Sequence, residues 1–160
     1  MAGWENFFIA EVGAAAALGG LLFVSISLNL TKILAIDGLP DRAGQSLLLI
    51  LAVLVLASLM LMPNQPLTLV GVEILVVSVV TFAFGTLFAV RAKRAVPAEY
   101  RGNFIWNIVA FEVAMIPCII GGGTVLAGST LGLYWLAAGI CISFVKATSE
   151  AWVLLVEINR

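Results

Sequence analysis

Five apolar stretches, each long enough to cross the hydrocarbon core of a membrane, take up most of this chain. A spanning helix needs about 20 apolar residues, because it rises about 1.5 Å per residue through roughly 30 Å of hydrocarbon. Of the 160 residues, 62% are hydrophobic and 11% are charged, so the links leave no room for a soluble domain. The sequence therefore predicts an all-α integral membrane protein. Its single transmembrane domain covers residues 1–160, with five spans at 7–30, 46–62, 67–90, 104–126 and 131–156.

The links between the spans differ in charge, and this difference predicts the orientation. The second and fourth links carry no charged residue, whereas the first and third carry all the basic residues that lie between spans (Lys32, Arg42, Arg91, Lys93, Arg94 and Arg101). Lysine and arginine are enriched in cytoplasmic links. We therefore expect the N-terminus outside and the C-terminus inside. An odd number of spans agrees with this, because it places the two termini on opposite sides of the membrane.

Composition argues against several classes of protein. A net charge of −1 does not suit phosphate neutralisation, so we expect no nucleic-acid partner. The chain has no histidine, the commonest general base and transition-metal ligand, and we expect no enzymatic activity, cofactor or metal site. Cys118 and Cys141 both lie in apolar stretches, where two buried thiols are favoured over a disulfide.

Small residues recur at helical spacing in the first span. Gly13, Ala17 and Gly20 fall on one face, where another helix could approach closely. This face packs either against other spans of the chain, which we favour, or against a second copy in a homo-oligomer. The second span has only Ser58 as a polar side chain between residues 48 and 62, so we place it at the lipid-facing periphery. The glycine-rich residues 121–132 form either a re-entrant loop or, as we favour, a flexible outer turn.

Four glutamates lie inside the predicted spans (Glu11, Glu73, Glu112 and Glu150), where a charge costs roughly 2.5–3.5 kcal/mol on insertion scales. Glu11 and Glu73 lie at similar depths, roughly 6–9 Å below the outer surface at the helical rise. They form either a paired acidic site or two separate packing groups. Glu112 lies close to the midplane, shortly before Pro117, which frees a backbone carbonyl. It is either an ion-binding group or a neutral group that holds the helix register.

A lysine lies deep in the last span. Lys146 is roughly 15 Å from the cytoplasmic boundary, too far for its ammonium to reach water easily. It therefore needs a carboxylate partner, either Glu150 four residues later or Glu112 at a similar depth. On the first span Asn29 belongs to a broken polar stripe, and Asn107 is placed to meet it near the inner side.

Several segments resemble a family of short bacterial inner-membrane proteins of unassigned function. The resemblance is carried by FFIAEVGAAAALGGLLFVSISLNLTKIL, LPDRAGQSLLLIL, MPNQ and the closing WVLLVEINR. Some members of that family are labelled as modulators of the membrane protease FtsH. The resemblance implies a multi-pass protein of the bacterial plasma membrane, and it assigns no functional residue.

Two functions remain open at this point. The first is an oligomeric channel or transporter-like protein that conducts a small ion past the intramembrane polar groups (Glu11, Glu73, Glu112, Lys146, Glu150, Asn29 and Asn107). We favour it because ionisable residues inside a membrane are functional candidates by default. The second is a non-catalytic accessory or scaffold protein that binds a larger membrane protein. A polar lumen supports the first, and a dry core with an apolar outer face supports the second.

Overall fold

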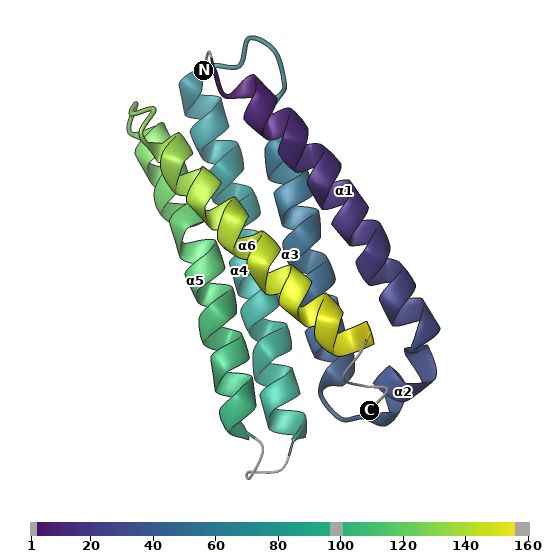
Figure 1. Ribbon diagram of the computed structural model, residues 1–160. Helices are drawn as coiled ribbons and strands as arrows, with labels where there is room; N and C mark the ends of the chain where they lie inside the picture. Colours follow the sequence, from purple (N-terminus) through teal and green to yellow (C-terminus); the bar gives the residue numbers. More distant parts are fainter. Residues whose placement is uncertain (1–2, 97–100, 156–160) are drawn as a thin grey trace.

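The chain folds into a bundle of long helices that run up and down side by side (Figure 1). The computed structural model describes residues 3–96 and 101–155, with the side chains of residues 101–104 and 155 left aside. This part of the chain forms six helices and no strand: α1 (Glu5–Leu28), α2 (Leu30–Ala35), α3 (Leu39–Met60), α4 (Leu67–Ala95), α5 (Arg101–Leu126) and α6 (Gly132–Leu155). Five of them, all except the short α2, are long and apolar enough to cross a membrane, which confirms the predicted number of spans.

The helix expected at the periphery lies at the centre of the bundle. α3 packs against α1, α4 and α6, and Leu49, Val53 and Leu56 are among its many buried side chains. The prediction was wrong because lipid tails are as apolar as leucine, so a helix without polar groups suits the core as well as the lipid. α1 lies at the edge of the bundle, against α3 and α6 (Figure 1).

The first link is shorter than the sequence suggested. α2 continues the chain after a break at Asn29, and α3 begins at Leu39, within the segment read as a polar link. Pro40 fits the first turn of α3, where a helix does not need its backbone N–H. Gly38 has a φ of 79°, and a Cβ there would lie 2.8 Å from the carbonyl oxygen of Ala92. The link is therefore packed against the end of α4.

Glycines bring α4, α5 and α6 together. A Cβ added to Gly122 of α5 would lie 2.9 Å from the backbone nitrogen of Leu75 on α4, and one added to Gly121 would lie 2.7 Å from the carbonyl oxygen of Gly132. Residues 121–126 are helical, and the turn covers only residues 127–131. The re-entrant loop is therefore wrong, and the outer turn that we favoured is confined to residues 127–131, because Gly121 and Gly122 are helix contacts.

The small-residue face of α1 points away from the bundle. Gly13, Ala17 and Gly20 are exposed, and no heavy atom lies within 4 Å of a Cβ added to either glycine. The buried side of α1 carries Phe8 and Leu22 instead. The favoured interpretation, packing of this face within the chain, is therefore wrong for these three residues, whereas the neighbouring Ala15 is fully buried.

Both cysteines are free, so the disulfide alternative is also wrong. Cys118 is buried beside Gly139 of α6, as expected, whereas Cys141 is exposed on the surface of the same helix.

Candidate functional site

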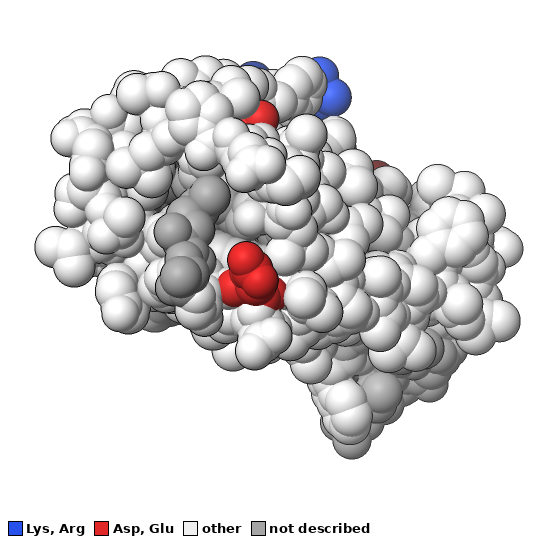
Figure 2. All heavy atoms as spheres, turned by 90° about the horizontal axis from the view of Figure 1, so that it is seen from above, with Lys and Arg blue, Asp and Glu red and all other residues white. Residues whose placement is uncertain are grey.

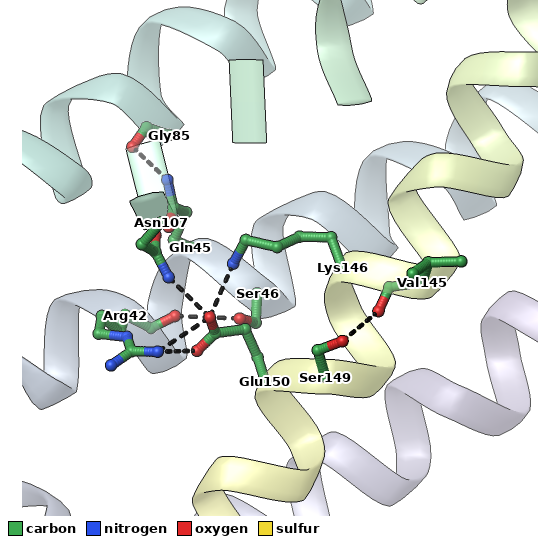
Figure 3. A network of polar contacts seen from close by, with 9 residues as sticks. All are labelled: Arg42, Gln45, Ser46, Gly85, Asn107, Val145, Lys146, Ser149 and Glu150. Atoms are coloured by element: carbon green, nitrogen blue, oxygen red, sulfur yellow. Dashed lines mark hydrogen bonds and ion pairs between the residues drawn. The ribbon is translucent and has the colours of Figure 1, made fainter. Parts of the chain in front are cut away.

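Four polar side chains from three helices meet near the lower end of the bundle in Figure 1, where α3 and α5 begin and α6 ends. Arg42 comes from the first turn of α3, Asn107 from α5, and Lys146 and Glu150 from α6 (Figure 3). Asn107, Lys146 and Glu150 are each less than 9% exposed. We call these four residues the charge cluster.

Glu150 is the acceptor at the centre of the charge cluster. Its Oε1 accepts from Asn107 Nδ2 at 2.6 Å, from Lys146 Nζ at 2.9 Å and from Arg42 Nη2 at 3.0 Å. Its Oε2 accepts from the same Arg42 nitrogen at 2.9 Å. An ionised carboxylate can accept about four hydrogen bonds, and Glu150 accepts four. The carboxylate thus ties α3, α5 and α6 together.

Backbone contacts hold the α3 side of the charge cluster in place. Ser46 donates to the carbonyl of Arg42 at 3.1 Å, and Gln45 donates to the carbonyl of Gly85 on α4 at 3.1 Å (Figure 3). Gly85 itself lies against the ring of Phe111 on α5, which a Cβ would overlap. The start of α3 is therefore fixed against α4 as well as against α6.

The pairing of Lys146 with Glu150, four residues apart on one helix face, is confirmed. The alternative partner, Glu112, makes no ion pair or hydrogen bond among the described residues. Arg42 was missed because its segment was read as a link. The signal for it was present: glycine followed by a proline and an aspartate in the next three residues is typical of a helix start.

The remaining predicted polar residues do not join the charge cluster. Asn29 donates to the carbonyls of Ser25 and Leu154, at 3.2 and 3.0 Å, and so links α1 to α6 instead of meeting Asn107. Glu73 accepts from Gln65 at 3.1 and 3.2 Å near the α3–α4 turn. Glu11 lies on α1, which packs against α3 and α6, whereas α4, which carries Glu73, packs against α3 and α5. The paired acidic site therefore gains no support.

A cavity of about 410 Å³ opens at the surface between α5 and α6. Arg42, Asn107, Lys146 and Glu150 line it together with apolar side chains, so the charge cluster forms one of its walls. Within the described ranges, no three histidine, cysteine, aspartate or glutamate side chains gather as they would around a metal ion.

No family model, curated protein or solved structure matches this chain. The function therefore has to be argued from the arrangement of its own residues.

Proposed function

We propose that this protein is a non-catalytic accessory protein of the bacterial plasma membrane that packs against a second, larger membrane protein. The observation that carries the proposal is the outward small-residue face of α1. Gly13, Ala17 and Gly20 lie on a long apolar helix at the edge of the bundle, with no other part of the described chain over the two glycines. Small residues let two helix backbones approach closely, and such close packing is one of the forces that associate helices in lipid.

The filled interior favours an accessory role over ion conduction. Large apolar side chains from every long helix occupy the centre of the bundle and are less than 2% exposed, among them Phe8, Leu49, Ile74, Phe111 and Leu136. The buried hydroxyls of Ser25 and Ser143 donate to carbonyls four residues earlier in their own helices, so they are not turned toward a water-filled path. An ion would have to pass through this packed region or between copies of the chain.

The distribution of charge supports an orientation with the N-terminus outside. Lys32, Arg42, Arg91, Lys93 and Arg94 all lie on α2, at the start of α3 or at the end of α4, which gather at the lower end of Figure 1. The upper end, seen in Figure 2, is almost entirely uncharged, with a few acidic groups and basic groups only at its margin. Under the positive-inside rule the lower end faces the cytoplasm.

Photo-crosslinking in native membranes tests the proposed contact. A photoreactive residue at Ala17 should give a discrete heavier adduct, whereas one at Val79, on the lipid-facing side of α4, should give none. Adding Gly13→Leu and Gly20→Leu should remove the adduct without lowering the unfolding temperature, because neither change meets another part of the described chain. Equal adducts from Ala17 and Val79 would contradict the proposal, and an adduct with the mass of two copies would assign the face to self-association.

Reconstitution into liposomes separates this proposal from the channel. We expect no cation, anion or proton flux above that of empty liposomes at any applied potential. A sustained flux that is lost in Glu112→Gln, which keeps the shape of the side chain but cannot ionise, would overturn the accessory role.

A further inference from the structure

The cavity between α5 and α6 has a polar end and an apolar end. Arg42, Asn107 and Lys146 line the part nearer the lower end of the bundle, while Val113, Ile142 and Val145 line the part nearer its middle. α5 and α6 run in opposite directions, so residues just after the start of α5 lie beside residues just before the end of α6. The cavity therefore changes from charged to apolar along the direction from the membrane surface to the midplane.

Two buried side chains in this cavity have donors beyond those that Glu150 uses. The ammonium of Lys146 has three N–H groups and the amide of Asn107 has two, and within the described part of the chain each side chain makes one hydrogen bond, to Glu150 Oε1. Both residues are more than nine-tenths buried. Because Glu150 already accepts four contacts, an acceptor that enters the cavity would meet these remaining donors.

A phosphate group matches these donors. Its oxygens are strong acceptors, and charge-assisted hydrogen bonds from an ammonium to such oxygens are about twice as strong as neutral ones. Glu150 carries one negative charge and shares it between Arg42 and Lys146. An anion that entered the cavity would therefore meet an ammonium that is already held in place.

We propose that this cavity binds the phosphodiester headgroup of an anionic phospholipid, with an acyl chain along Val113, Ile142 and Val145. A free phosphate ion would use only the polar end, whereas a lipid uses both ends in the orientation that it already has in a leaflet. Its lining residues Trp106, Val113 and Val145 are 75%, 49% and 70% exposed, so the cavity is open at the outer surface of the bundle, where a lipid could enter. Basic pockets between spans are a known way to hold anionic headgroups.

Tryptophan quenching by brominated lipids tests this proposal, because Trp106 lies on the wall of the cavity. A variant that keeps only Trp106 is reconstituted into mixtures of phosphatidylcholine and phosphatidylglycerol in which one lipid has brominated chains. Brominated phosphatidylglycerol should quench Trp106 well beyond its mole fraction. A matched variant that keeps only Trp135, at the opposite end of α6, should report the bulk composition. Equal quenching of Trp106 by the two lipids would overturn the proposal.

Two substitutions assign the preference to the cavity. Lys146→Met should weaken it roughly fivefold, as expected for one basic group beside an anionic lipid. Lys93→Met removes the same charge at the same end of the bundle and should leave the preference unchanged. Ala110→Phe keeps every charge and fills the cavity from α5, so it should abolish the preference even if the lysine variant fails to fold.

Inorganic phosphate distinguishes the two sources of the anion. Millimolar phosphate added to both sides of the membrane should leave the quenching unchanged, because the apolar end of the cavity favours the lipid. Loss of the lipid preference in phosphate, but not in chloride of equal ionic strength, would assign the site to a free anion. A preference that persists in both Lys146→Met and Ala110→Phe would contradict the site altogether.

Discussion

Glu150 holds together two cations that lie on different helices. Arg42 contacts both of its oxygens and Lys146 contacts one, all at 3.0 Å or less. Bringing two positive groups together away from water is costly unless a carboxylate offsets their charge. Removing the carboxylate should therefore destabilise the protein more than removing one cation. Without the carboxylate two like charges face each other, whereas without one cation an ion pair remains.

We predict that Glu150→Gln lowers the free energy of unfolding by about 3–5 kcal/mol, the usual cost of breaking a buried ion pair. Lys146→Met should cost less, because Arg42 still contacts both oxygens of Glu150. Denaturant titration in detergent micelles measures both. Glu73→Gln, whose carboxylate bonds only to Gln65 among the described residues, serves as the control and should change stability by about 0.5 kcal/mol or less. A larger loss in Lys146→Met than in Glu150→Gln would contradict this account.

Of the contacts in the charge cluster, the sequence predicted the one that lies on a single helix. Lys146 and Glu150 are four residues apart, and the cost of an isolated lysine in lipid demanded a partner nearby. Arg42 and Asn107 reach the same carboxylate from α3 and α5, more than 40 residues away in the chain. Helical spacing carries no information on such contacts, because they depend on how the helices are arranged.

Helix α5 meets its neighbours through glycines whose backbones almost touch the next helix. Gly122 lies against Leu75 of α4, and Gly121 lies against Gly132 at the start of α6. The glycines of α1 look similar in sequence but face outward. The sequence thus identified residues suited to close packing, but a small residue does not say whether its partner lies in the same chain.

We predict that Gly122→Leu destabilises the bundle, whereas Gly13→Leu does not. The leucine at position 122 would have to push α5 away from α4, and overpacking of this kind costs roughly 1–3 kcal/mol or more. Gly13 has open space around it. The two unfolding temperatures, measured side by side in detergent, check this. Equal losses would mean that α1 is covered by another part of the chain.

The central position of α3 gives a second test. Leu56→Ala should cost about 2–5 kcal/mol, because it leaves a cavity in a packed core. Leu51→Ala, on the same helix but 55% exposed, should change stability by about 0.5 kcal/mol or less. Were α3 at the periphery, as its sequence first suggested, the two variants would unfold at the same denaturant concentration.

For the whole molecule, the number of spans followed from the sequence because every backbone N–H and C=O group in lipid must be bonded within its own helix. That requirement makes each span a helix, and the thickness of the hydrocarbon core then sets the length of each apolar stretch. The order of the helices around the centre did not follow, since no difference between leucine and lipid tells a central helix from a peripheral one. Polar side chains were a poor guide as well: Glu11, Glu73 and Glu112 lie on three different helices without forming a shared site.

We predict that the end of the bundle with the N-terminus faces the outside of the cell. In a background with Cys141→Ala, which keeps only the buried Cys118, cysteines introduced at Thr68 and Ser129 should react with an impermeant thiol reagent added to intact cells. Cysteines at Asp37 and Ala95 should react only after the membrane is permeabilised, which also shows that both are accessible. Labelling of the second pair in intact cells would reverse the orientation, and labelling of all four would contradict a spanning bundle.

The first and last long helices are joined by the amide of Asn29, which donates to the carbonyl of Leu154 at 3.0 Å. Translation adds about 5–20 residues per second, so α1 and α3 enter the bilayer several seconds before α6 exists. During that interval, neither the Leu154 acceptor for Asn29 nor the Glu150 carboxylate for Arg42 has been made. The contacts that join Asn29 and Arg42 to α6 therefore form last, after the helices that precede α6 have been made.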